Sequence, residues 1–243
     1  MERIQKMIAA TGLCSRRHAE ELIQKGEVMV NGQPATIGMK VSPQDTIVVQ
    51  GKPLSGRPAS EFLVLHKPKN VMVTRHDPQK RPTVYEYLPK GSSLLSVGRL
   101  DFDSEGLLLF TSRREIIHQL THPSFEIPRT YEVKVQGVVT PETMAKITSG
   151  VSLGVGALLQ KSGPATVRLL KTNPYNCWVE ITLKEGKNRE VRKIFEAVGH
   201  LVLRLKRVAY GPVRLGDLPP GASRPLEPEE ERQLDRLLKS LVG

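Results

Sequence analysis

The chain has 243 residues, a length that favours two domains. Hydrophobic residues make up 39%, enough for at least one core, whereas aromatic residues make up only 5%, so a bound nucleic acid would be held mainly through its phosphates. The only two cysteines, Cys14 and Cys177, exclude a disulfide framework and show no metal-binding spacing, and no apolar run resembles a signal peptide or a membrane span. We therefore expect a cytoplasmic protein without a membrane partner.

The charge balance is strongly basic. Lys and Arg number 36 against 25 Asp and Glu, which gives a net charge of +11 and a pI near 9.8. Residues 184–214 contain nine Lys or Arg and three Glu, whereas 227–231 form an acidic patch. A solvated basic surface is the alternative, but clustered positive charge is typical of proteins that bind a polyanion, because each neutralised phosphate releases counterions.

The first elements form a helix–helix–strand pattern. Apolar residues at helical spacing predict a helix from Ile4 that ends near Gly12, and Ser15 is suited to cap a second helix. Short strands are predicted at 28–30 and 47–49, the first followed by an Asn-Gly turn signal. A segment rich in Gly, Pro and Ser comes next. We place the domains at 1–55 and 62–243, with the linker at 56–61.

The segment 15–32 (SRRHAEELIQKGEVMVNG) resembles the S4 domain, an RNA-binding module. In that family paired helices present basic side chains to structured RNA, and the matching residues are Lys6, Arg16 and Arg17. The same residues also suit ordinary exposed helix positions. The resemblance implies that residues 1–55 bind RNA.

Strands and helices alternate after residue 62. Strands are predicted at 62–65, 131–136 and 178–183, the last two from alternation of polar and apolar residues. A basic helix is predicted over 186–200, and the final segment, 227–242, reads as a helix with glutamates at its start. The pattern indicates an α+β protein.

The most informative stretch is 98–111 (GRLDFDSEGLLLFT). Its Asp-x-Asp-x-Glu-Gly pattern suggests a calcium loop, but Ser112 stands where the bidentate Glu is needed. Asp101 and Asp103 could also be a glycosidase carboxylate pair, although the sequence does not establish their spacing in space. A structural role before the apolar run is the third reading.

Four ordered segments resemble bacterial pseudouridine synthases that modify small- or large-subunit ribosomal RNA. They are HKPKNVMVTRHDPQKRPTVYEYLP (66–89), GRLDFDSEGLLLFT (98–111), RTYEVKV (129–135) and GKNREVRKIFEAVGHLVLRLKRVAYG (186–211). The resemblance implies an N-terminal S4 RNA-binding domain linked to a catalytic domain built on a mainly antiparallel sheet with flanking helices.

Roles follow from the matching positions. Asp101 would be the catalytic aspartate, Tyr131 the ring packed on the target uracil, and Arg192 the ionic partner of Asp101. The residues expected to contact the substrate RNA are Arg99, Leu100, Lys187, Asn188, Arg189 and Lys193. Asn70 and Lys80 stand where the family usually has glycines, and Lys187 and Glu190 replace the more usual Arg and Gln.

The implied reaction breaks the C1′–N1 bond of a uridine, turns the uracil and joins C1′ to C5. It changes no oxidation state, so we expect neither a cofactor nor a metal. The expected substrate is ribosomal RNA, with the large-subunit (23S) RNA of a ribosomal precursor favoured over the small-subunit RNA, and the expected enzyme is a monomer. The sequence leaves open whether the aspartate attacks C1′ or removes a sugar proton. An N-glycosidase that releases the base and a non-catalytic assembly factor remain as alternatives.

Overall fold

The computed structural model describes residues 2–11, 13–42, 44–54, 62–89, 92–154 and 160–241. The chain forms two compact units. One comprises Met1–Phe62 with Leu88–Leu94, and the other comprises Leu63–Tyr87 with Leu95–Gly243. The linker predicted at 56–61 lies outside the described residues.

Both predicted helices of the first unit are present, as α1 (Ile4–Ala10) and α2 (Arg16–Gln24). The hydroxyl of Ser15 caps α2 by accepting a hydrogen bond from the backbone N–H of His18, as predicted for this residue. Gly12, predicted to end the first helix, lies outside the described residues.

A small antiparallel sheet completes this unit, in the order β3-β2-β5-β6. Asn31 and Gly32, both with positive φ, make the tight turn between the first two strands along the chain. Ile4, Ile8, Leu22, Val28 and Val49 belong to a core that is confined to this unit. The strands are β1 (Glu2–Arg3), β2 (Val28–Val30), β3 (Gln33–Pro34), β4 (Lys40–Val41), β5 (Ile47–Val49) and β6 (Lys52–Pro53).

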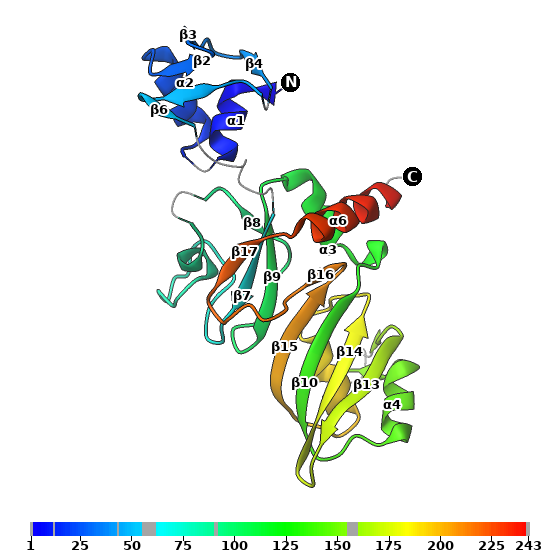
Figure 1. Cartoon of the computed structure of the whole chain (residues 1–243). Coiled ribbons are helices and arrows are strands. Elements are labelled where there is room, and N and C mark those ends of the chain that lie inside the picture. The colour runs from blue at the N-terminus through cyan, green and yellow to red at the C-terminus, as the bar shows by residue number, and fades with distance from the viewer. Residues whose placement is uncertain are drawn as a thin grey trace. The chain divides into compact units, whose positions relative to one another are not determined.

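The second unit is built on a nine-stranded sheet with the central order β13-β14-β10-β15-β9-β7-β17 (Figure 1). β10 runs antiparallel to both of its neighbours, whereas β15 and β9 are parallel. The strands of this unit, with a separate pair β11–β12, are β7 (Phe62–Lys67), β8 (Leu95–Ser96), β9 (Glu105–Thr111), β10 (Arg129–Gln136), β11 (Ser152–Leu153), β12 (Gln160–Lys161), β13 (Ala165–Thr172), β14 (Asn176–Leu183), β15 (Val202–Tyr210), β16 (Val213–Arg214) and β17 (Ser223–Pro225).

Alternation along the strands creates one buried face. In β14, Cys177, Val179, Ile181 and Leu183 are buried and the residues between them are half-exposed, which confirms the strand predicted there. These residues form a core with β10 and with the apolar side of α5 (Glu190–Ala197). The further helices are α3 (Ile117–Thr121), α4 (Pro141–Thr148) and α6 (Pro228–Ser240).

The basic helix is shorter than predicted at both ends. α5 covers 190–197 rather than 186–200, and its N-cap, Arg189, has a left-handed backbone with φ of 51°. A left-handed residue cannot continue a right-handed helix, so 186–189 form a loop. The C-terminal helix agrees with the prediction, and Glu227 and Glu230 form a capping box at its start.

Candidate active site

The segment 98–104 is a loop between β8 and β9, and Asp101 lies at its centre. Gly98, with φ of 71°, turns the chain away from β8. The backbone N–H of Ser104 donates to the carbonyl of Asp101 at 3.1 Å, and the N–H of Asn70 donates to the carbonyl of Phe102 at 2.7 Å. The backbone around the aspartate is therefore tied on both sides.

A fully buried lysine, Lys67, holds this loop through hydrogen bonds to its backbone carbonyls. Lys67, at the end of β7, donates through Nζ to the carbonyls of Pro68 at 2.9 Å, Ser104 at 2.8 Å and Phe102 at 3.4 Å. Burial lowers the pKa of Lys67 to about 8, although nearby carboxylates, Asp103 foremost, favour its charged form. The ammonium thus fixes the loop that carries Asp101 while its own charge is satisfied by carbonyl oxygens.

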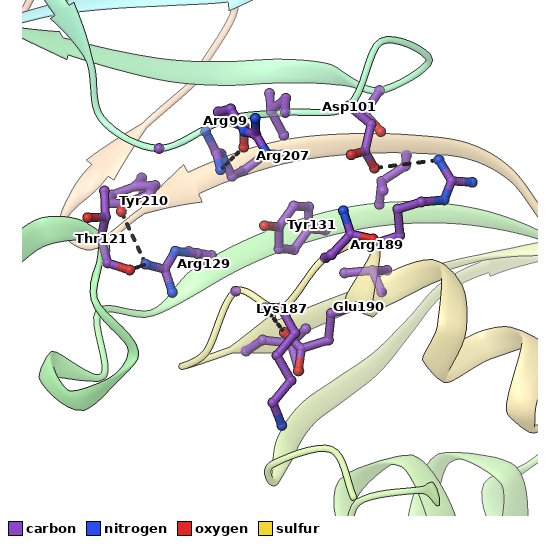
Figure 2. A pocket seen from close by; sticks show the side chains of 18 residues that line it. Arg99, Asp101, Thr121, Arg129, Tyr131, Lys187, Arg189, Glu190, Arg207 and Tyr210 are labelled. Atoms are coloured by element: carbon purple, nitrogen blue, oxygen red, sulfur yellow. Dashed lines mark hydrogen bonds and ion pairs between the residues drawn. The ribbon is translucent and has the colours of Figure 1, made fainter. Parts of the chain in front are cut away.

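A cavity of about 280 Å³ opens beside the loop (Figure 2). Tyr131, from β10, lies among the labelled residues, with Asp101 and Arg189 on one side and Arg129 and Tyr210 on the other. The cavity is lined by Gly98, Arg99, Leu100, Asp101, Ser104, Thr121, Arg129, Tyr131, Leu183, Gly186, Lys187, Asn188, Arg189, Glu190, Val191, Leu205, Arg207 and Tyr210. Two segments far apart in the sequence, the 98–104 loop and the 186–189 loop, therefore meet at one cavity.

Asp101 keeps a third of its side chain exposed and faces Arg189, whose Nη1 lies 3.8 Å from Asp101 Oδ2 and 3.7 Å from Asp103 Oδ1. Arg189 has a left-handed backbone, directly precedes α5 and lines the cavity (Figure 2). The carboxylate at the cavity thus has a cationic neighbour while remaining open to a ligand.

The prediction that Arg192 pairs with Asp101 is wrong. Arg192 Nη2 lies 2.7 Å from Asp103 Oδ2 and 3.5 Å from the hydroxyl of Ser104, and Nη1 donates to the carbonyl of Val202 at 3.4 Å. Arg192, in the first turn of α5, contacts the Asp103–Ser104 end of the loop and does not line the cavity. It holds the aspartate two residues beyond the one that the resemblance assigned to it.

Glu190 brings a second carboxyl group to the cavity. It is 4% exposed, and its Oε2 accepts from the backbone N–H of Lys187 at 3.0 Å. Burial and the adjoining carboxyl of Glu185 raise the pKa of Glu190 to about 7. The pKa of Glu185 falls to about 2: burial opposes that shift, but hydrogen bonds with Glu190, Lys187 and the N–H of Gly163 favour its charged form. The pair therefore shares one proton over the intervening pH range.

The other predicted contact residues divide into three groups. Arg99, Leu100, Lys187 and Asn188 line the cavity, and Lys187 also pairs with Glu185 at 2.8 Å. Lys193 is exposed on α5 outside the lining. The remaining predicted contacts, Lys6, Arg16 and Arg17, belong to the first unit and are exposed there. Lys6 forms an ion pair with Glu2.

The family model described as RNA pseudouridylate synthase matches residues 61–197, which is more than half of the chain. The chain belongs to the RNA pseudouridylate synthase family. A separate model, the S4 domain, matches residues 2–47. Both matches confirm the families that the motifs resemble.

Named relatives of this synthase family cover nearly the whole chain. The ribosomal large subunit pseudouridine synthase B of Bacillus subtilis (strain 168) is 39% identical, over 98% of this chain and 97% of its own. The protein of that name from Escherichia coli (strain K12) is 39% identical, over 98% of this chain and 84% of its own. A crystal structure of a pseudouridylate synthase superposes with a TM-score of 0.63 at 28% identity, covering 96% of this chain and 100% of the other.

Sequence reasoning missed several residues of the synthase cavity and its support. Lys67 is the last residue of an apolar strand, a position where a lysine is normally exposed. Arg129, Arg207 and Tyr210 are buried and line the cavity, although none of them is among the site residues predicted from the motifs. The available signal was alternation: Arg207 shares its strand face with Leu205, which belongs to the core.

Within the described ranges, no cluster of three or more His, Cys, Asp or Glu side chains could hold a metal ion. No helix in the same part of the chain is long and apolar enough to cross a membrane.

Proposed function

We propose that this synthase converts a uridine of large-subunit ribosomal RNA to pseudouridine in the cytoplasm, acting as a monomer with Asp101 as the catalytic carboxylate. The observation that carries the assignment is the cavity itself, which brings Asp101 and Tyr131 together in a member of the RNA pseudouridylate synthase family. The choice of the large subunit follows the names of the relatives, which match over nearly the full chain.

The reaction needs a carboxylate beside the sugar and a surface that retains the detached base. Asp101 is assigned to the sugar, where it either attacks C1′ or removes a sugar proton as the C1′–N1 bond breaks. Tyr131 is assigned to the face of the uracil, which turns so that C5 can bond to C1′. N1 takes up a proton, and C5 loses one.

Of the two carboxyl groups at the cavity, Asp101 suits this role better than Glu190. Asp101 is partly exposed and has Arg189 beside it, whereas Glu190 is buried and engaged with Glu185 and Lys187. Arg192 acts one step away, because it holds Asp103 and Ser104 of the same loop. We assign Arg192 as a positioning residue.

The target nucleotide of a folded RNA must leave its stack to enter a cavity of this size. Arg99, Asn188 and Arg189 are exposed residues of the lining and Lys193 lies on the neighbouring helix, so these side chains are assigned to the flanking backbone. Lys6, Arg16 and Arg17 are assigned to RNA contact by the S4 domain.

Substitution of Asp101 by Asn tests this assignment. The amide keeps the shape of the side chain but loses the charge and the nucleophilic oxygen, so Asp101→Asn should bind the RNA and release no tritium from 5-tritiated uridine in a large-subunit ribosomal RNA transcript. Asp103→Asn is the matched control on the same loop; it should retain more activity because Asp103 does not line the cavity. Full tritium release by Asp101→Asn would sink the assignment.

The same assay separates the alternatives. Free uracil released by the parent protein would indicate an N-glycosidase, and RNA binding without any reaction would indicate an assembly factor. Mapping pseudouridine in ribosomal RNA from a deletion strain identifies the target nucleotide and the subunit.

A further inference from the structure

Two arginines at the cavity are buried, Arg129 with 5% and Arg207 with 2% of its surface exposed. Within the part of the chain that the structure describes, neither forms an ion pair with a carboxylate. Burying a charge without a counter-charge is costly unless its donors are satisfied. How each guanidinium is satisfied therefore indicates what it does.

Arg129 is held by the protein on several sides. Its Nη2 donates to the carbonyls of Leu120 at 3.3 Å and Thr121 at 3.1 Å and to the hydroxyl of Tyr210, and its Nη1 donates to the carbonyl of Lys184 at 3.4 Å. These bonds tie β10 to the C-terminal end of α3 and to the residue that follows β14. Arg129 therefore has a structural role.

Arg207 is satisfied only in part. Its Nε donates to the carbonyl of Leu107 at 2.8 Å and its Nη1 to the carbonyl of Arg99 at 3.5 Å. The third nitrogen, Nη2, is buried and has no hydrogen-bond partner. Figure 2 shows this guanidinium beside Arg99. A free donor on a buried cation that lines a cavity is a site for an acceptor supplied by a ligand.

The position of Arg207 in the sheet determines which part of a bound nucleotide it can contact. In the β10–β15 ladder, Arg207 is the Cα partner of Tyr131, and both side chains line the cavity. A base packed against Tyr131 would therefore place its edge beside Arg207. The cations that suit phosphates are the exposed ones, such as Arg189, whose side chain is 47% exposed.

We propose that Arg207 donates a hydrogen bond to a carbonyl oxygen of the uracil and stabilises the negative charge that the base acquires when it is detached. This inference rests on the proposed function. When C1′–N1 breaks, the bonding electron pair leaves with the base, whichever role Asp101 takes, and the charge spreads over N1 and the carbonyl oxygens. C5 then bonds to C1′, the proton on C5 leaves and N1 is protonated. The negative charge on the base therefore exists only after C1′–N1 has broken and before C1′–C5 has formed. A preorganised cation at that place lowers the barrier without moving.

Single-turnover kinetics of Arg207→Lys test the proposal, with 5-tritiated large-subunit ribosomal RNA transcript as substrate. Lysine keeps the positive charge but loses the fork that spans the carbonyls of Leu107 and Arg99 and the cavity. The rate constant at saturating RNA should fall about 10- to 100-fold, and the RNA concentration for half-saturation should change much less. Arg224→Lys is the matched control, because Arg224 pairs with Glu230 and does not line the cavity; its rate should equal that of the parent.

A transcript containing 5-fluorouridine separates charge stabilisation from a structural defect. Fluorine withdraws electrons and stabilises the detached base by itself, so consumption of the target 5-fluorouridine, followed by mass spectrometry, should depend several-fold less on Arg207 than the reaction of uridine does. Each variant reacts with both substrates through the same folded fraction, so the ratio does not depend on folding yield. Arg207→Gln, which keeps an amide donor but no charge, should show the same trend more strongly.

Equal losses with both substrates would overturn the proposal and leave a structural role. A change only in the RNA concentration for half-saturation would also overturn the proposal, because it would indicate that Arg207 contacts the bound RNA, for example a phosphate, before the reaction begins. A parent enzyme that releases no tritium would overturn the proposed function, and this inference with it, whereas an active parent with unaffected Arg207 variants would overturn the inference alone.

Discussion

Ionisable side chains that are buried beside the cavity respond to burial in opposite directions. The ammonium of Lys67 remains in place because three backbone carbonyls surround it, and its pKa falls to about 8. Glu190 responds by holding a proton, with a pKa of about 7, beside the charged carboxylate of Glu185. Burial disfavours the charged form of either group, which lowers the pKa of a base and raises that of an acid.

Glu190→Gln should make the thermal stability less dependent on pH between about 4.5 and 7. A carboxyl group with a raised pKa stabilises the fold while protonated and loses that contribution as the pH rises through its folded value, here about 7. Glu185 has a lowered pKa and loses its contribution only under acid conditions, so it does not titrate in this window. Relative to the variant, the parent should lose up to about 1.4 kcal/mol per pH unit as the pH rises from about 4.5 to about 7, and no more above the raised pKa.

Melting temperatures measured in a pH series check this expectation. Gln can accept from the N–H of Lys187, so the variant keeps that hydrogen bond and stays neutral beside Glu185. Glu196→Gln, an exposed position on the same helix, is the control and should follow the parent. Parallel curves for the parent and Glu190→Gln would contradict the shared proton.

At the scale of elements, the parallel junction of β9 and β15 determines where the cavity forms. Gly106 pairs with Arg207 across this junction, with φ of 114°, and a Cβ at Gly106 would collide with the backbone of Arg207. A glycine is required because the strands approach so closely and because L side chains rarely adopt that φ. The junction also places the loop that carries Asp101 next to the strand that carries Arg207.

Gly106→Ala should therefore destabilise the protein by more than about 3 kcal/mol, from backbone strain together with displacement of β15. Denaturant unfolding measures this loss. Gly216→Ala is the control, because Gly216 has φ of 58° but open space around its Cβ position, and it should cost only about 1 kcal/mol. Similar losses in the two variants would mean that strain alone, rather than the close approach, requires glycine at position 106.

At the scale of the whole molecule, each unit has its own hydrophobic core. One core involves Ile4, Ile8 and Leu22, and the other lies between α5 and the strands of the large sheet. The net charge of +11 indicates that phosphate contacts contribute much of the affinity for RNA. We propose that the first unit, which the S4 model matches, binds RNA and that the second unit carries the catalytic site.

Deletion of residues 1–55 should weaken binding of ribosomal RNA and leave the remaining domain folded. Circular dichroism of the truncated chain checks the fold, and filter binding over a salt series checks the affinity. The logarithm of the binding constant of the full chain should fall linearly with the logarithm of salt concentration, by about 0.7–0.9 for each phosphate contacted. An unfolded truncation would contradict the domain boundaries, and a salt-independent affinity would contradict the phosphate contacts.

The sequence by itself determined the features that depend on local pattern. The alternation in 178–183, the cap at Ser15 and the glutamates at the start of α6 each predict an element within a few residues, because burial on one face requires a fixed spacing. The family motifs likewise identify Asp101 and Tyr131 as candidates, and the structure places both at one cavity.

Only the tertiary structure decided which cations surround them. Arg189, rather than Arg192, faces Asp101. Arg189 has a left-handed backbone and ends the loop directly before α5, a conformation that helical periodicity does not predict. Arg207 joins the cavity because β15 pairs with β10 and, in parallel, with β9. These pairings bring Arg207 opposite Tyr131, 76 positions away, and Gly106, 101 positions away. Such pairings depend on the packing of the whole sheet, so no local pattern in the sequence contains them.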